Sequence, residues 1–199
     1  KYRYGFTGTL DGTQTHKWVL EGLFGPSYKI ISTKKLQDAG YLAKLNIKVL
    51  LMKHEPQKFD AYEDEVQFII QNEKRNNFIK NLAHDLKGNT LILYSRVATH
   101  GQILYDLINN DNRKVFFVHG GVDAEEREEV RSITETQKDA IIVASFGTFS
   151  TGINIKNLHN IIFASPSKSR IRTLQSSGRV LRKGNNKISA TLYDIADDT

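Results

Sequence analysis

Residues 140–145 read Ala140-Ile-Ile-Val-Ala-Ser145, an unbroken apolar run that ends on a hydroxyl side chain. Unbroken apolar runs of this length are typical of strands that are buried on both faces of a parallel sheet. Similar runs occupy residues 90–94, 115–118 and 160–164. We therefore predict buried parallel strands at residues 140–144, 90–94, 115–118 and 160–164.

Helical patterns alternate with these runs along the chain. Helices are predicted over residues 62–86 (one long helix or two shorter ones), 97–108, 123–134 and 169–180, and further strands over residues 47–52 and 188–193. Strands that alternate with helices predict an α/β fold, with a mainly parallel sheet and helices on both faces. Ligands of such sheets bind at the carboxyl ends of the strands.

The start of the chain has a different pattern. Short strands are predicted at residues 2–7 and 28–31, on either side of a helix at residues 16–24. Two short strands and one helix cannot bury a core of their own. We therefore assign residues 1–31 to the end of a preceding domain and residues 32–199 to the α/β domain.

Bulk composition excludes several classes of protein. Of the 199 residues, 39% are hydrophobic and 25% are charged, which is ordinary for a globular domain. We expect neither a membrane span nor a signal peptide, because no apolar run or N-terminal pattern fits one. The chain has no Cys, which excludes disulfides and thiolate zinc sites and fits a cytoplasmic location.

Charge is unevenly distributed along the chain. The net charge is +6 and the sequence pI is about 9.4. Residues 140–193 contain no Asp or Glu but carry several cations, namely Lys156, Lys168, Arg170, Arg172, Arg179, Arg182, Lys183 and Lys187. An acidic segment at residues 123–139 comes directly before this stretch. This segregation predicts one face that binds phosphate and another that is turned to solvent.

The order Gln175-Ser-Ser-Gly178-Arg179-Val-Leu-Arg182 places two arginines three residues apart within a predicted helix. That spacing puts both guanidiniums on one helix face. Paired planar donors suit a polyphosphate ligand. For this octet taken alone, a basic surface turn is the alternative.

Other short motifs precede this octet, and most of them follow a predicted strand. They are Phe6-Thr7-Gly8-Thr9, Leu91-Ile-Leu-Tyr-Ser95-Arg96, Val118-His119-Gly120-Gly121 and Ser145-Phe-Gly-Thr148-Phe-Ser-Thr-Gly152-Ile-Asn154. In this order and approximate spacing, the motifs resemble the second half of a superfamily 2 helicase, and phage members of that superfamily in particular. The resemblance covers nearly the whole chain.

The resemblance implies a second RecA-like lobe, preceded by a remnant of the first, in an enzyme that couples ATP hydrolysis to movement on DNA. It implies unwinding or remodelling of branched DNA in recombination and repair, in the host cytoplasm for a phage protein. By resemblance, Arg179 and Arg182 would be arginine fingers on the γ-phosphate. Gly152, Asn154 and Gln175 would contact the nucleotide.

The same resemblance assigns other residues to nucleic acid. Ser95 and Arg96 would form a loop that contacts the backbone, and His119-Gly120 would present amides to the strand. Either Ser145 or Thr148 would bind a phosphate, and the choice between them is open because one extra residue separates this position from Gly152. Thr7, Gly8 and Thr9 would couple the state of ATP to nucleic-acid binding.

The sequence lacks a G-x-x-x-x-G-K-[ST] phosphate loop, and it lacks an Asp-Glu pair placed to hold Mg²⁺. No metal site is predicted on this chain. ATP and Mg²⁺ are therefore expected to be held mainly by a missing N-terminal lobe, which is also an expected partner. This chain alone is expected to hydrolyse ATP no faster than background.

Three alternatives remain open at the level of sequence. The first is an RNA helicase or a double-strand DNA translocase of the same superfamily, because contacts to backbone phosphates carry no base information. The second is a non-catalytic nucleic-acid-binding α/β domain, against which the paired arginines argue. The third is a nucleotide-metabolising α/β enzyme, which the basic terminal third disfavours.

Overall fold

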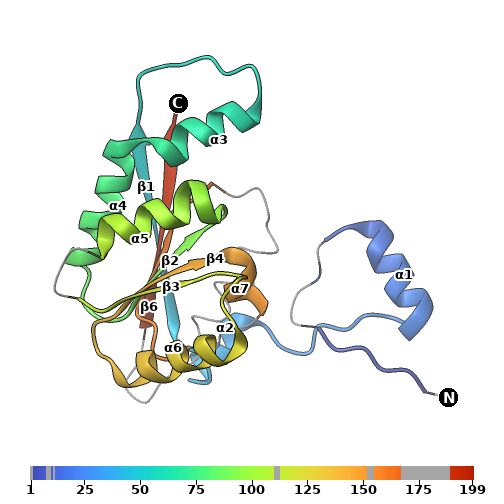
Figure 1. Cartoon of the computed structure of the whole chain (residues 1–199). Helices are drawn as coiled ribbons and strands as arrows, with labels where there is room; N and C mark the ends of the chain where they lie inside the picture. Colours follow the sequence, from blue (N-terminus) through green and yellow to red (C-terminus); the bar gives the residue numbers. More distant parts are fainter. Residues whose placement is uncertain (1, 8–9, 11, 110–112, 152–154, 167–188) are drawn as a thin grey trace.

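A single parallel sheet organises the chain (Figure 1). The computed structural model describes residues 2–7, 10, 12–109, 113–151, 155–166 and 189–199. Within these described ranges, six strands lie in the order β1-β6-β5-β2-β4-β3, and every pair of neighbours is parallel. Their bounds are β1 Lys44–Lys53, β2 Thr90–Tyr94, β3 Val115–Val118, β4 Ile141–Ser145, β5 Asn160–Phe163 and β6 Ser189–Asp198. The predicted α/β class with a parallel sheet is confirmed.

Strand β2 lies near the middle of the sheet, and all its residues are buried. Alternate side chains of a strand point to opposite faces. Leu91 and Leu93 accordingly join one hydrophobic cluster, and Ile92 and Tyr94 join the other. The unbroken apolar run is therefore explained by two covered faces.

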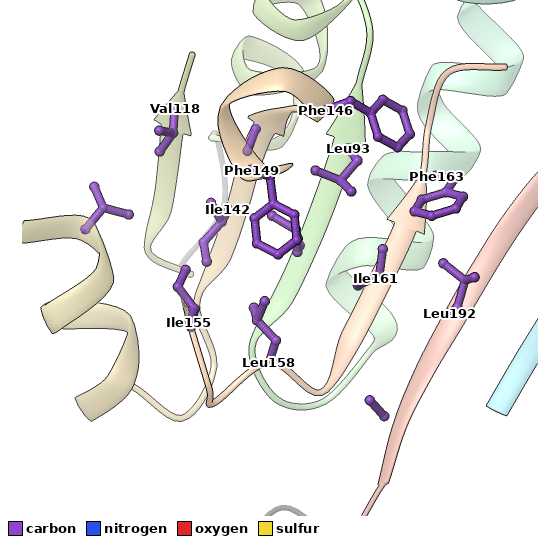
Figure 2. Close-up of a cluster of buried hydrophobic side chains, with 14 residues drawn as sticks. Leu93, Val118, Ile142, Phe146, Phe149, Ile155, Leu158, Ile161, Phe163 and Leu192 are labelled. Atoms are coloured by element: carbon purple, nitrogen blue, oxygen red, sulfur yellow. The ribbon is translucent and has the colours of Figure 1, made fainter. Parts of the chain in front are cut away.

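Helices α6 (Ala124–Thr136) and α7 (Phe146–Thr151) cover one face. Figure 2 shows Phe146 and Phe149 of α7 packed over side chains from β4, β2 and β5. The opposite face is covered by α4 (Glu73–Asp85) and α5 (Gln102–Ile108), through Ile79, Ala83, Leu104 and Ile108. Connections between parallel strands of one sheet are right-handed. The connections from β1 through β2 to β3 run in one direction across the sheet, and those from β3 through β4 to β5 run in the opposite direction. The helices of the two sets therefore lie on opposite faces.

Two helices, rather than one, occupy residues 62–85. Helix α3 (Tyr62–Gln71) ends before Asn72, and α4 begins directly after it. Asn72 has an extended backbone, and its side chain accepts a hydrogen bond from the Arg75 amide at 3.0 Å. An N-cap of this kind supplies a partner for an amide that the helix leaves unpaired.

The segment after β2 also departs from a simple helix. Residues Val97–Gly101 form a π-helical turn, here η1, and α5 follows it without a break. The Gly101 amide donates to the Arg96 carbonyl at 2.9 Å, five residues back. Wide turns of this type are rare, and they are frequent at functional sites.

The prediction of strands at residues 2–7 and 28–31 is wrong. Neither segment is a strand, because neither pairs with another strand in the part of the chain that the structure describes. Helix α1 (Gln14–Phe24) is present but buries no residue, and Figure 1 shows it beside the sheet rather than on it. Helix α2 (Thr33–Asp38) has Ser32 as its N-cap, and the Ser32 side chain accepts a hydrogen bond from the Lys35 amide.

Other predicted elements differ in extent. Strands β1 and β6 are longer than predicted, since both extend to 10 residues and pair along their full length. Helix α7 was not predicted, because its short segment lacks helical periodicity. The helix predicted at residues 169–180 lies outside the described residues.

Asn89 joins several segments at the amino end of β2. Its fully buried side-chain nitrogen lies 2.8 to 2.9 Å from the carbonyl oxygens of Thr134, Gln137 and Asn157, so its two hydrogens are shared among three acceptors. Its side-chain oxygen accepts from the Ala140 amide at 2.8 Å. One buried residue thereby connects the end of α6 to the strands on both sides of β2.

Replacing Gly101 with Ala is expected to lower the free energy of unfolding by about 1–3 kcal/mol, the usual cost of overpacking. A Cβ at Gly101 would overlap the ring of Tyr94, which is fully buried and cannot move aside. Gly147→Ala is the matched control, because a Cβ at that exposed helical position meets nothing within 4 Å. Urea unfolding of both variants checks the expectation, and equal stabilities would contradict it.

Candidate functional site

Three loops meet at the carboxyl edge of the sheet. Tyr94 at the end of β2 pairs with Ser145 at the end of β4, and Val118 at the end of β3 pairs with Ala144. The residues that follow β2 and β3 are Ser95 and His119, so both lie beside Ser145. The register therefore brings together three of the positions that the sequence marked as separate motifs.

The strand order gives this edge a switch point between β2 and β5. The chain leaves β2 toward β3, on one side, whereas β5 is followed by β6, on the other side. In open parallel sheets, ligands bind outside the carboxyl ends of strands where the connections diverge in this way. Ser95 follows β2 and Ser165 follows β5 by two residues, so both lie at this point.

Ser145 and Thr148 form one hydroxyl pair. Their side-chain oxygens are 2.8 Å apart, and the Thr148 amide donates to the Ser145 hydroxyl at 3.2 Å. Thr148 is only 6% exposed, whereas Ser145 is half-buried. Of the two hydroxyls, that of Ser145 is the more accessible to a ligand.

Ser95 is exposed, and Arg96 beside it is partly buried. The Arg96 guanidinium pairs with Glu63 and donates to the Gln67 side-chain oxygen at 3.3 Å, and both partners lie on α3. Helix α3 carries Glu63, Asp64 and Glu65 in its first turn. The positive charge of Arg96 is therefore already engaged by an acidic helix, which weakens its attraction for another anion.

His119 and Gly120 form the start of the loop after β3. The His119 ring packs 5.1 Å from the Phe117 ring, and its Nδ1 accepts from the Gly121 amide at 3.1 Å. Gly120 is exposed, and a Cβ there would meet nothing within 4 Å. Open space at this glycine leaves its backbone accessible to a ligand.

A buried polar cluster lies directly behind Ser95. The Ser95 amide donates to the Ser165 hydroxyl at 3.0 Å, and that hydroxyl is 2.8 Å from Nδ1 of His100. Nε2 of His100 is 3.2 Å from the side-chain oxygen of Asn76. Burial, and then the nearby Arg75 guanidinium, lower the pKa of His100 to about 3, so the imidazole is neutral.

Arg75 forms a second buried cluster beside the first. Its Nε donates to both carboxylate oxygens of Asp197, at 2.8 and 3.1 Å, and one Nη donates to the Ala164 carbonyl at 2.5 Å. Asp197 also lies 2.8 Å from Nε2 of His54. The cluster joins the start of α4 to the ends of β1, β5 and β6, and its buried charges are paired as burial requires.

The exposed donors of this edge suit phosphate oxygens. Hydroxyls, backbone amides and an arginine are the groups through which proteins contact a nucleic-acid backbone. Among the described residues, no group of three or more His, Asp or Glu side chains could hold a metal ion. No described helix is long and apolar enough to cross a bilayer.

Several predicted site residues lie outside the described residues. These are Gly8, Thr9, Gly152, Asn154, Gln175, Arg179 and Arg182. Thr7 is described and is exposed. The structure thus brings together Ser95, His119, Ser145 and their neighbours, and the roles predicted for the remaining residues stay predictions.

Asn76, His100 and Ser165 were missed at the level of sequence. Ser165 could have been found, because it closely follows a buried apolar strand as Ser95 does. His100 and Asn76 carry no such signal. A histidine and an asparagine within helical patterns are indistinguishable from ordinary surface residues until the helices are packed.

Comparison with known proteins decides the family. Residues 73–184, more than half of the chain, match the helicase conserved C-terminal domain. The chain belongs to this helicase family. It is 37% identical over 205 residues to the ATP-dependent DNA helicase uvsW of Enterobacteria phage T4, with 98% of the chain and 40% of the relative covered. A putative ATP-dependent RNA helicase of Acanthamoeba polyphaga mimivirus is 32% identical over 127 residues, with 62% and 23% covered.

Solved structures agree with the helicase assignment. The crystal structure of T4 UvsW matches with a TM-score of 0.68 at 36% identity, and covers 89% of this chain and 35% of that one. Domain 2 of the DEAD-box helicase Mss116p, bound to an RNA duplex, shares the fold with a TM-score of 0.55 at 14% identity, with 78% and 55% covered. This helicase chain spans less than half the length of the curated relatives it matches.

The lowered pKa of His100 predicts a loss of stability in mild acid. The folded pKa is about 3 and the usual value is 6.5, so between these values the unfolded chain binds the extra proton. Stability should therefore fall as the pH falls through this window. Urea unfolding from about pH 7 to about pH 4 should show a larger loss for wild type than for His100→Asn. Equal losses in the two proteins would contradict the prediction.

Proposed function

We propose that residues 32–199 form the second RecA-like lobe of an ATP-dependent DNA helicase, and that residues 1–31 belong to the first. The observation that carries the proposal is the identity of 37% with a phage DNA helicase over nearly the whole chain. The gathering of Ser95, His119 and Ser145 at one sheet edge supports it, because a nucleic-acid strand laid there meets all three loops.

In this proposal, the carboxyl edge binds the nucleic-acid backbone. Ser95 and Ser145 donate hydroxyl hydrogen bonds to phosphates, and the backbone amides around His119-Gly120 do the same. Ser145 takes the contact rather than Thr148, because Thr148 is buried and its amide already donates to the Ser145 hydroxyl. Thr148 orients Ser145 through this pairing.

ATP and Mg²⁺ are assigned by the family rather than by the described residues. Gly152, Asn154 and Gln175 would contact the nucleotide, and Arg179 and Arg182 would neutralise charge on the γ-phosphate. Arginine fingers in related nucleotide hydrolases are worth about 10³–10⁵ in rate. The phosphate loop and the metal ligands would come from the first lobe.

Exposed apolar side chains support the assignment of residues 1–31 to another lobe. Tyr2, Phe6 and Ile30 are 91%, 89% and 87% exposed. Side chains of this kind are normally covered by a partner surface. Thr7, Gly8 and Thr9 would then lie between the lobes, where they couple the state of ATP to nucleic-acid binding.

Branched DNA is the proposed substrate, in the context of recombination and repair. RNA is the second candidate, because a relative at 32% identity is named a putative RNA helicase. Branched DNA, linear duplex DNA and RNA should be compared as activators of ATP turnover in the full-length enzyme. Strongest activation by branched DNA supports the proposal, and activation by RNA alone overturns it.

Arg182→Ala in the full-length enzyme should lower kcat for ATP by about 10³-fold or more while DNA affinity changes little. The lost contact acts on the transferring phosphate and matters most in the transition state. Arg182→Lys should restore little activity, because an ammonium lacks the planar fork. Arg131→Ala is the control, since within the described part of the chain Arg131 pairs with Glu128 and Glu135 on its own helix. Normal turnover by a folded Arg182→Ala enzyme would refute the assignment.

Glu63→Gln should strengthen DNA binding about two- to fivefold, because it frees the Arg96 guanidinium from a surface ion pair. Arg96→Ala should weaken binding and reduce the log–log salt slope by about 1, the value for one phosphate contact. Glu128→Gln is the matched control, because it removes a carboxylate from an arginine on α6. Unchanged DNA affinity in both the Glu63 and Arg96 variants would show that Arg96 only holds α3 in place and does not contact DNA.

A further inference from the structure

A chain of hydrogen bonds runs from the end of helix α3, through a side chain of α4, to the loop after β2. It begins at the Ile70 carbonyl, which accepts from the Asn76 side-chain amide at 2.9 Å. It continues through His100 and Ser165 and ends at the Ser95 amide. Each of the three linking side chains is at least 95% buried: Asn76 is 3% exposed, His100 is 0% and Ser165 is 4%.

The direction of every bond in this chain is fixed. The Asn76 amide nitrogen is used by Ile70, so its oxygen faces His100 and can only accept. Nε2 of the neutral imidazole must therefore carry the proton, which leaves Nδ1 as an acceptor. The Ser165 hydroxyl then donates to Nδ1 and uses a lone pair to accept from the Ser95 amide. No member can reverse its role without leaving a buried group unpaired.

The π-helical turn η1 brings His100 into this position. The wide turn, closed by the Gly101 amide on the Arg96 carbonyl, directs the His100 ring inward. Gly101 permits it, because only a residue without a Cβ fits against the Tyr94 ring. His100, which links α4 to the sheet edge, thus lies in a rare type of turn and directly before a glycine that this packing requires.

We propose that Ser165, His100 and Asn76 are positioning residues that fix the backbone at Ser95, so that its exposed hydroxyl meets a nucleic-acid phosphate. The inference rests on the proposed nucleic-acid contact at the carboxyl edge. Ser165 is suited to this role because it bridges β2 and β5 at the switch point of the sheet. Arg75 holds the neighbouring Ala164 carbonyl, so the bridge itself is anchored to α4.

The first experiment measures the hydrogen bond without reference to function. Amide exchange at Ser95, followed by NMR, should become about tenfold faster or more in Ser165→Ala, because its acceptor is lost. Ser165→Thr keeps a hydroxyl and should retain most of the protection. Thr134→Val is the control, since it removes an equally buried hydroxyl bond to the Val130 carbonyl on α6, away from this edge. Unchanged exchange at Ser95 in Ser165→Ala overturns the proposal.

The second experiment measures the consequence in the full-length enzyme. In Ser165→Ala, the DNA concentration for half-maximal ATP turnover should rise about three- to tenfold, with kcat at saturating DNA retained. Ser165→Thr should restore the wild-type value, and Thr134→Val should leave it unchanged. Faster exchange at Ser95 without a change in DNA dependence overturns the positioning role. Wild-type enzyme that fails to respond to any nucleic acid overturns the proposed function instead.

A third measurement needs no variant, and so survives if Ser165→Ala does not fold. The ¹⁵N shifts of the His100 ring in the wild-type chain should report a neutral imidazole protonated at Nε2. Protonation at Nδ1 would reverse the chain of bonds, leave the Asn76 oxygen without a donor and overturn the proposal.

Discussion

Parallel pairing of β2 with β4 on one side and β5 on the other is the constraint on which the rest of the structure depends. Because β2 is buried along its whole length, its backbone groups can be paired only by strands. The pairing fixes the register, and the register brings the carboxyl ends of β5, β2 and β4 to the same level. The candidate site is a consequence of that level edge rather than of any single motif.

Both ends of β2 are held by buried neutral polar groups. Asn89 ties its amino end to α6 and to β4 through its side-chain amide. Ser165 ties the residue after its carboxyl end to β5. Neutral groups serve here because an isolated charge would be costly to bury, whereas a fully paired amide or hydroxyl is not. The buried charges of this region, Arg75 and Asp197, neutralise one another.

The strands in the middle of the sheet could be predicted from the sequence, because burial on both faces requires an unbroken run of apolar residues. The runs at 90–94, 115–118 and 140–144 became β2, β3 and β4 within one residue. The short apolar segments at 2–7 and 28–31 misled, because apolar residues make a strand only where another strand is available to pair. The break between α3 and α4 depends on the side-chain cap at Asn72. Helix α7 depends on a hydroxyl at the end of β4. Neither feature leaves a periodic signal in the sequence.

The residues of the candidate site likewise divide into those that the sequence could predict and those that it could not. Ser95, His119 and Ser145 could be predicted because each follows a buried strand, and parallel strands bring such positions together. Arg96 could be named as a site residue, but its engagement by Glu63 could not be foreseen. That engagement depends on how α3 packs. The Asn76-His100-Ser165 chain was equally hidden, because its members come from α4, η1 and the segment after β5 and meet only in the folded protein.

Ser95 and Arg96, the two candidate contact residues that follow β2, therefore differ in physical character. Ser95 is a neutral group whose backbone is fixed by buried bonds, so its geometry is independent of salt and of pH near neutrality. Arg96 is a charge held by a solvent-exposed carboxylate, and such pairs exchange partners at little cost. A phosphate approaching this edge would find one donor already in place and one cation that is already paired with a carboxylate. Neither contact reads a base or a sugar hydroxyl. On the proposed function, a choice between DNA and RNA would therefore depend on other surfaces of the protein, because this edge suits a backbone of either kind.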